Sequence, residues 1–305
     1  MADMAVQLPQ HSASPAAGRA RFFNSANAFA QEASRIPDAT FCHEPAAALK
    51  AGAPGGLIHC DLSASLEIEG PATSPLLLAS YVVISANGAF CGNCHATASI
   101  WYVIRGKGQT NCQGDQFDWM SGDLFLLPGG SGAELTAGPD GAVLWRVTNE
   151  PHLVFEGLQP PPSEAAVTPV VHYPAAEINH QLDKIYQVAR GEQTAGLAII
   201  FSSDQQQGRR NILPTLTLAM NSLPPGEMQP PHRHNSVAVA LVVHGLDCYS
   251  IVDGQRKDWS QWATTVTPPG ALHSHHNDGD ERAQILIVQD GGLYTHARTM
   301  GFSFT

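Results

Sequence analysis

The chain has 305 residues, and its 16 Lys and Arg against 27 Asp and Glu give a formal net charge of −11 when histidines are neutral. An acidic surface argues against nucleic acid as a partner, because phosphates need a basic surface. No apolar run of about eighteen residues is present, which argues against a membrane span. The N-terminus lacks the basic start and apolar core of a secretory signal, so we expect a cytoplasmic protein with six reduced cysteines.

The first segment is predicted to be an N-terminal arm and helix over residues 1–55. The helix would run from Arg19 to Arg35 and pack through one apolar face. That face carries Phe22, Phe23, Phe29 and Ala30. Beyond this segment, 28 Gly and 22 Pro favour many short strands joined by tight turns.

A Cys91-x-x-Cys94-His95 motif has the spacing of a c-type haem attachment site. Haem attachment of this kind requires export, which the N-terminus does not support. A zinc site would need a second Cys or His pair at zinc spacing, and that pair is missing. We therefore interpret these residues as small buried side chains at the start of a strand.

The middle of the chain is predicted to connect two domains. Residues 157–169 are rich in proline and place a boundary near residue 160. Apolar residues at helical spacing then predict a helix over 175–191 that packs against a neighbouring domain. These residues are Ile178, Leu182, Ile185 and Val188. Residues 161–210 are thus expected to form a connector with one helix.

Two histidines at positions i and i+2 are the strongest functional signal. His232 and His234 would point to the same face of a strand, where both can bind one ion. The apolar run 237–243 predicts a buried strand, and a further strand near 262–268 ends at a Pro-Gly turn that would bring His273 to the same place. Because neutral imidazoles are common ligands of first-row metals, the three histidines predict a metal site with open coordination positions.

The spacing of these residues resembles the two sequence motifs of the cupin family. The first motif would be Gly226, His232-x-His234 and Gly245, and the second Pro268-x-Gly270-x-x-His273-x-x-x-Asn277. Two positions depart from the general pattern, since Ala238 replaces a glutamate ligand and Trp262 replaces a glycine. Without the carboxylate the site becomes a three-histidine site, which resembles that of the gentisate and salicylate ring-cleaving dioxygenases.

The first half contains a second copy of the strand pattern. Ile100 to Gly106 is similar to Leu241 to Gly245, and Gly122 to Gly130 keeps the turn spacing of the second motif. We therefore predict an all-β protein with two cupin (double-stranded β-helix, jelly-roll) barrels, at residues 56–160 and 211–305.

Only the second barrel is expected to bind metal. Aligning Gly106 with Gly245 places Asn93 and His95 opposite His232 and His234, and Ala133 opposite His273. One histidine of three does not hold a metal tightly, so the first site is predicted to be degenerate. In the dioxygenases that the chain resembles, the iron usually lies in the first barrel. The last residues, 291–304, are predicted to form a final strand across a neighbouring barrel or subunit, and the extended termini favour a homo-oligomer.

The resemblance implies an Fe(II)-dependent enzyme that acts on a small aromatic acid and O2. Three neutral ligands leave a formal charge near +2 at the ion, which attracts an anionic chelating substrate. A benzoate with an ortho hydroxyl or amine fits this description. The resemblance further implies ring opening between the carboxylate-bearing carbon and its heteroatom-bearing neighbour, in a substrate of the gentisate, salicylate or 5-nitroanthranilate type.

Several residues are predicted to handle this substrate. His275 is a candidate for accepting the proton released when the hydroxyl or amine binds the metal, with a simple polar neighbour as the alternative. Salicylate-type enzymes carry a carboxylate-pairing arginine at the position of Ala240, so the charge would have to come from elsewhere. Along the sequence the nearest arginines are Arg210, Arg282 and Arg298, although an arginine at such a position is more often a solvated surface charge. His244 and His276 are expected to be structural.

Two other classes of function stay open on the sequence alone. Cupins with metal sites include thiol dioxygenases, lyases and isomerases that use other metals. The second class is a non-enzymatic bicupin for binding or storage. Such a protein would not need an intact set of ligands, so the presence of His232, His234 and His273 counts against it.

Overall fold

The computed structural model describes residues 6–25, 33–91, 94–130, 132–187 and 197–304, and the chain divides into two compact units, Met1–Arg35 and Ile36–Thr305. In the first unit, α1 (Pro15–Gly18) begins at Ser14, whose hydroxyl accepts a hydrogen bond from the backbone N–H of Ala17 at 3.1 Å. Gln7 and Phe22 form an isolated β-bridge.

The helix predicted over residues 19–35 is wrong where the structure describes this range. Residues 19–25 and 33–35 contain no helix, and the side chains of Phe22 and Phe23 are exposed. Asn24 and Ser25 favour turns over helix interiors, because their side chains compete for backbone hydrogen bonds. Phe29 and Ala30 lie outside the described residues.

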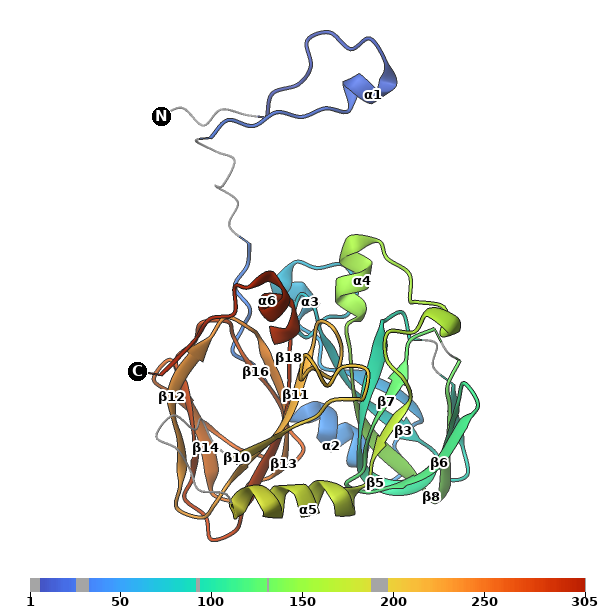
Figure 1. Cartoon of the computed structure of the whole chain (residues 1–305), viewed down its shortest axis with the longest axis vertical. Helices are drawn as coiled ribbons and strands as arrows, with labels where there is room; N and C mark the ends of the chain where they lie inside the picture. Colours follow the sequence, from blue (N-terminus) through green and yellow to red (C-terminus); the bar gives the residue numbers. More distant parts are fainter. Residues whose placement is uncertain (1–5, 26–32, 92–93, 131, 188–196, 305) are drawn as a thin grey trace. The chain divides into compact units, whose positions relative to one another are not determined.

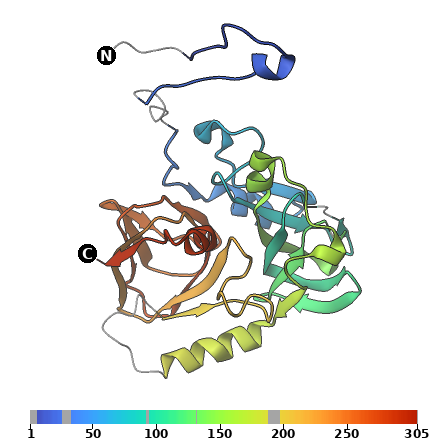
Figure 2. The same cartoon turned by 45° about the horizontal axis from the view of Figure 1, so that its top comes forward.

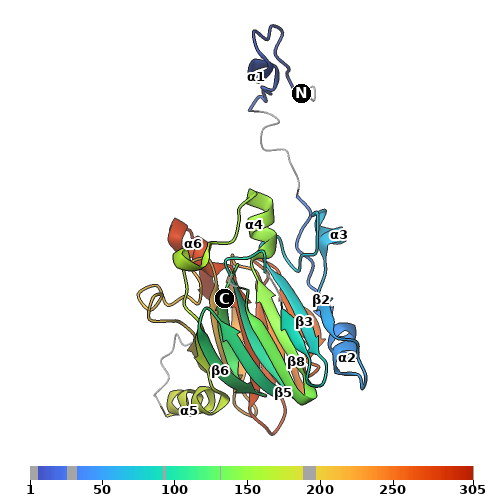
Figure 3. The ribbon, with the colours of Figure 1, turned by 90° about the vertical axis from the view of Figure 1, so that its right-hand side faces the viewer.

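The second unit begins with the first barrel (Figure 1). Its elements are α2 (His43–Leu49), β2 (Gly56–His59), α3 (Ser63–Leu66), β3 (Leu78–Ile84), β4 (Ala89–Cys91), β5 (Ala98–Cys112), β6 (Asp115–Met120), β7 (Leu124–Pro128), β8 (Glu134–Thr148), α4 (Glu150–Glu156), the 3-10 helix η1 (Ser163–Ala165), β9 (Val171–Tyr173) and α5 (Ala175–Tyr186). One sheet has the order β2-β3-β8-β5-β7-β9, with β4 paired to β8 and β6 paired to β5. Figure 3 shows β3, β8, β5 and β6 side by side.

The long strands β5 and β8 curve so that a single sheet closes the first barrel. Their pairing shifts register near Gly106, where an added Cβ would lie 2.4 Å from the carbonyl oxygen of Gly141. Such bulges bend a strand and increase its twist. Gly106 also has a φ of 98°, which favours glycine. The glycine that anchors the internal repeat is therefore required by the bend.

Bulky side chains fill the interior of the first barrel. Trp101 stacks on Phe125 with ring centroids 5.9 Å apart, and Trp119 is buried beside them. Among the described residues, no group of potential metal ligands occurs in this barrel. Asn93, which was aligned with His232, lies outside the described residues.

The cysteine motif of the first barrel was predicted to be buried, and the structure corrects half of that prediction. Cys94 is buried, whereas Cys91 at the end of β4 is exposed. In the structure, no disulfide joins any of the six cysteines, all of which are described.

The second barrel consists of two sheets (Figure 2). Residues of both sheets line a cavity between them. Its elements are β1 (Thr40–Phe41), β10 (Leu197–Ile200), β11 (Thr217–Leu223), β12 (Met228–His234), β13 (Ala238–His244), β14 (Cys248–Val252), β15 (Gln255–Asp258), β16 (Thr264–Thr267), β17 (His273–Asn277), β18 (Ala283–Gln289), α6 (Gly291–Ala297) and β19 (Phe302–Phe304). The sheets have the orders β1-β16-β13-β18-β11-β10 and β15-β14-β17-β12-β19. Strands β13 and β16 confirm the two strands predicted around residues 237–243 and 262–268.

Several strands pair with strands that belong to a different segment of the predicted domain division. β1 belongs to the predicted N-terminal segment but pairs with β16 of the second barrel, while β9 and β10 of the predicted connector pair with β7 and β11. The precise domain boundaries stay a prediction. Within the connector, α5 confirms the predicted helix up to Tyr186, and it packs through Ile178 and Leu182. Val188 lies outside the described residues.

The C-terminal segment differs from the single strand predicted for it. Residues Gly291–Ala297 form α6, and only Phe302–Phe304 form a strand, β19, which pairs with β12 of the same barrel. In the described part of the chain, no helix is both long and apolar enough to span a membrane.

Candidate metal centre

The three predicted histidines converge inside the second barrel. His232 and His234 lie on β12, and His273 lies on the neighbouring strand β17, where it pairs in register with His232. One nitrogen from each residue lies within 4.8 Å of the others, and all three side chains are buried. The alternation of side chains along β12 and the Pro-Gly turn before β17 therefore bring these residues together as predicted.

Backbone carbonyl groups hold each imidazole in a single tautomer. The Nδ1 atoms of His232, His234 and His273 lie 2.8, 2.8 and 2.9 Å from the carbonyl oxygens of Pro230, Ser236 and Ala271. A carbonyl can only accept, so each Nδ1 carries the hydrogen and each Nε2 keeps its lone pair. This arrangement orients imidazoles for metal binding.

Burial keeps the three imidazoles neutral. Removal from water lowers the pKa of His232 and of His234, and it lowers the pKa of His273 to about 3. Neutral imidazole is the form that binds metal. The donor set of three converging Nε2 lone pairs thus fits a first-row divalent ion.

The turn that opens the second motif adopts the conformation that normally requires glycine. Trp262, which stands in the glycine position, has a φ of 66°, and the equivalent Gly122 of the first barrel has a φ of 91°. The backbone N–H of Trp262 donates to the carbonyl oxygen of Val242 at 2.7 Å. The sequence departure at Trp262 therefore changes the residue and preserves the turn.

The histidines line a small enclosed cavity of about 100 Å³. Its lining comprises Asn221, His232, His234, Ala238, Ala240, Thr265, Thr267, His273, His275, Ile285, Ile287, Gln289, Met300 and Phe302. Ala238 and Ala240 leave space beside the ligands, as their small size predicts. The C-terminal residues Met300 and Phe302 close one side, and the Phe302 ring lies 5.4 Å from that of His232.

None of the three arginines predicted to bind the substrate lines this cavity. Arg282 donates to Asp183 at 2.9 Å and lies over the ring of Tyr186, while Arg210 and Arg298 are exposed. These positions were chosen by their distance along the chain, which does not determine which face of a strand or loop a side chain occupies.

His275 lies next to the ligands in a buried hydrogen-bond chain. Its ring is 5.7 Å from that of His273, and its Nδ1 lies 2.7 Å from the hydroxyl oxygen of Ser250. The indole N–H of Trp259 donates to the same oxygen at 2.8 Å. The indole can only donate, whereas the Ser250 hydroxyl either donates to Nδ1 of His275 or accepts from it, so these contacts fit both neutral tautomers of His275. Burial lowers the pKa of His275 well below its usual value, so this imidazole is neutral.

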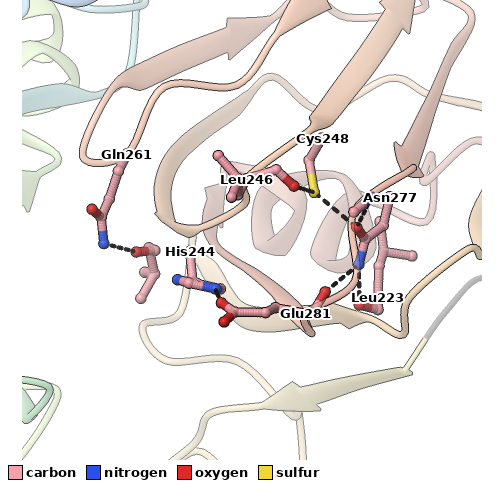
Figure 4. Close-up of polar contacts among 9 residues, drawn as sticks. Leu223, His244, Leu246, Cys248, Gln261, Asn277 and Glu281 are labelled. Atoms are coloured by element: carbon pink, nitrogen blue, oxygen red, sulfur yellow. Dashed lines mark hydrogen bonds and ion pairs between the residues drawn. The ribbon is translucent and has the colours of Figure 1, made fainter.

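The neighbouring polar residues of the second motif have structural contacts (Figure 4). The Asn277 amide donates to the carbonyl oxygens of Leu223 and Glu281 at 3.0 and 2.8 Å, and its oxygen accepts from the thiol of Cys248 at 3.2 Å. His244 contacts Glu281 at 2.6 Å. His276 lies outside the cavity and stacks on Tyr249 with ring centroids 4.6 Å apart.

Four polar residues of the cavity were not identified from the sequence, namely Asn221, Thr265, Thr267 and Gln289. Gln289 follows Ile285 and Ile287 at intervals of two, so strand alternation places all three on one face. That alternation was the available signal. It was missed because polar residues at strand ends are more often exposed.

The fold and the site define a bicupin with a three-histidine centre in its second barrel. Residues 220–289 match the family model described as a cupin domain, and residues 85–200 match the model described as an AraC-like ligand binding domain. The chain is also similar in fold to salicylate 1,2-dioxygenase from Pseudaminobacter salicylatoxidans, with a TM-score of 0.76 at 12% identity over 93% of this chain and 92% of that one. A likeness at this level of identity concerns the fold.

Curated relatives match shorter stretches of the chain. A gentisate 1,2-dioxygenase from a Ralstonia species is 41% identical over 73 residues, which is 24% of this chain and 21% of the relative. One from a Streptomyces species is 30% identical over 128 residues, covering 41% and 35%, and a 5-aminosalicylate 1,2-dioxygenase from a Comamonas species is 28% identical over 100 residues, covering 33% and 26%. These alignments span about a fifth to a third of the relatives' lengths. The similarity predicted from the two cupin motifs is confirmed.

Proposed function

We propose that this protein is an Fe(II)-dependent dioxygenase that cleaves the ring of an ortho-hydroxy or ortho-amino benzoate. The observation that carries the proposal is the set of three converging, neutral imidazoles without a carboxylate among the described ligands. The similarity to proteins named gentisate and 5-aminosalicylate 1,2-dioxygenases supports the same reaction class. Within that class, 5-nitroanthranilate stays a prediction, as do a cytoplasmic location and a homo-oligomeric state.

The residues of the cavity would each have a defined part in this reaction. His232, His234 and His273 would hold the iron, which when bound supplies a positive charge for the substrate and a redox-active centre for O2. Because no ligand is anionic, the charge that attracts an aromatic acid is preserved. The apolar walls, including Ile285 and Ile287, would contact the ring and exclude water.

His275 would assist at the ring's oxygen or nitrogen substituent. In the tautomer in which the Ser250 hydroxyl donates to Nδ1, the Nε2 of His275 donates a hydrogen bond. Accepting a proton at Nε2, the role predicted from the sequence, would first require the Ser250 hydroxyl to reverse, so that Nδ1 donates to it. We propose that His275 orients the substrate by donation and takes up a proton when this hydroxyl turns.

The test is to load the apoprotein with Fe(II) under anaerobic conditions and then add oxygen with a panel of substituted salicylates and anthranilates. Oxygen uptake together with loss of the aromatic absorbance is expected for at least one acid. A His232→Ala, His234→Ala double variant provides the control, since it should lose both metal and activity. Bound metal without oxygen uptake across the panel would instead favour a lyase or a binding protein.

A further inference from the structure

Gln289 brings an amide group next to the metal ligands. It is the last residue of β18, and its side-chain Nε2 lies 3.1 Å from Nε2 of His234. On the neighbouring strand β13 it pairs in register with Ala238, the position at which the general cupin pattern has a glutamate ligand. The amide therefore lies on the side of the site from which the usual carboxylate is missing.

The hydrogen-bond partners of His234 define what this amide does. Nδ1 of His234 donates to the carbonyl of Ser236, so Nε2 is an acceptor and Gln289 donates to it. An ion bound by the three histidines would use that same lone pair. The amide N–H would then lose its acceptor while remaining beside the coordination sphere. A donor in that position requires a new acceptor.

The other polar groups that line the cavity favour an anionic ligand as the acceptor for the Gln289 amide. Gln289 shares the cavity with Asn221, Thr265 and Thr267, all of them uncharged, and no arginine or lysine lines it in the described part of the chain. A carboxylate bound at the ion can accept a hydrogen bond from a neighbouring amide without any protein cation. Neutral donors of this kind orient an anion and leave its charge to be balanced by the metal.

We propose that Gln289 binds the carboxylate of the aromatic acid and replaces the arginine that the sequence lacks at Ala240. The inference rests on the proposed function and adds the residue that orients the substrate. The amide N–H donates to one carboxylate oxygen, and the ion binds the acid beside it. The substrate class that follows is a chelating benzoate whose carboxylate lies toward β18.

The test compares binding of two probes to the metal-loaded protein without oxygen. Salicylate carries the carboxylate, and catechol is a chelator of similar size without one. Replacing Gln289 by Leu removes the donor at nearly constant volume, so the Kd for salicylate should rise by about ten- to a hundredfold, as expected for loss of a hydrogen bond to a charged group. The Kd for catechol and the metal content should stay within about twofold of the wild-type values.

Two further variants separate this role from a structural one. Gln289→Glu should abolish salicylate binding by charge repulsion while metal content is retained, and Gln289→Asn should recover part of the affinity. Gln284→Leu is the matched control, because Gln284 lies on the same strand outside the lining of the cavity and should leave both Kd values unchanged. In turnover, Gln289→Leu should raise KM for the best acid of the panel more than it lowers kcat.

Equal losses of salicylate and catechol affinity in Gln289→Leu, or no loss of either, would overturn the inference. Its failure is distinguishable from failure of the proposed function because binding is measured without turnover. Wild-type protein that binds salicylate but consumes no oxygen with any acid refutes the dioxygenase and leaves the Gln289 contact to be judged by Kd. Wild-type protein that binds neither salicylate nor any other panel acid refutes both.

Discussion

At the scale of single residues, the three converging histidines share one kind of local hydrogen bond. Each imidazole donates from Nδ1 to a carbonyl oxygen two residues away along its own strand or turn. Such short-range contacts fix the ring orientation before any ion binds. The site therefore depends mainly on local backbone geometry, which is why ligand spacing along the sequence was informative.

His275 provides the prediction at this scale. His275→Ala should slow turnover by about ten- to a hundredfold while metal content stays nearly unchanged, because the side chain lines the cavity without belonging to the converging triad. Steady-state kinetics and metal analysis of the same preparation check this. His276→Ala is the matched control, since His276 lies outside the cavity and should retain activity. Loss of metal from His275→Ala would show that His275 is a ligand.

The other polar residues of the cavity could not be predicted from the sequence. The convergence of the three histidines could be predicted because His232 and His234 are two residues apart on one strand and a Pro-Gly turn precedes His273. Gln289 approaches them through the pairing of β13 with β18, which joins residues about fifty positions apart (Ala238 with Gln289). Arg210, Arg282 and Arg298 do not line this cavity, because no local pattern in the sequence reports which side chains reach a cavity made by several strands.

At the scale of elements, strands were predicted better than terminal helices. Alternation and Pro-Gly turns located β13, β16 and the first-barrel repeat. The helix α6 was not predicted, since residues 291–304 were expected to form one strand, and Gly291 and Gly292 are poor helix formers. The structure requires a glycine at position 292 for another reason, since a Cβ on Gly292 would lie 2.5 Å from the backbone of Thr215. Close tertiary packing thus outweighs propensity here.

Asp290, at the N-terminal end of α6, leads to a prediction about how the stability of the protein depends on pH. Asp290 precedes α6, accepts a hydrogen bond from the backbone N–H of Val237 at 2.9 Å, and has its pKa raised by burial from 3.8 to about 6. A raised pKa means that the protonated form stabilises the folded state, and this stabilisation is lost as the pH rises through about 6. Asp290→Asn should therefore stabilise the apoprotein at pH 8 by up to about 3 kcal/mol.

The gain should fall to about half that value at pH 5, because the native carboxyl is then largely protonated. Denaturant unfolding of both proteins at the two pH values measures the difference. Equal gains at pH 8 and pH 5 would show that the effect does not come from ionisation of Asp290.

At the scale of the whole molecule, the two barrels share a core. Apolar residues of both barrels form one buried cluster, and Thr264 of β16 lies at their junction. Its hydroxyl accepts a hydrogen bond from the Trp145 indole at 2.9 Å and lies 2.7 Å from the hydroxyl of Tyr81. The repeat in the sequence predicted two barrels, but it carried no information about this contact, which joins residues more than a hundred positions apart (Trp145 with Thr264).

Thr264→Val should destabilise the protein by about 1–3 kcal/mol, because the Trp145 N–H would lose its buried acceptor at unchanged side-chain volume. Thermal or denaturant unfolding should show a single transition at a lower midpoint. Thr265→Val is the control on the adjacent, cavity-facing position, where a change of stability within about 0.5 kcal/mol is expected. Two separate transitions in Thr264→Val would indicate that the barrels unfold independently.

The pairing of β1 with β16 also bears on how the polypeptide matures. Thr40 and Phe41 leave the ribosome long before the strand beside which they finally lie. One sheet of the second barrel is completed by β1, a segment that is synthesised much earlier, so the second barrel reaches its full strand pairing only with the N-terminal part of the chain present. A gene fragment that encodes the metal-binding half alone would expose an open backbone edge and invite aggregation.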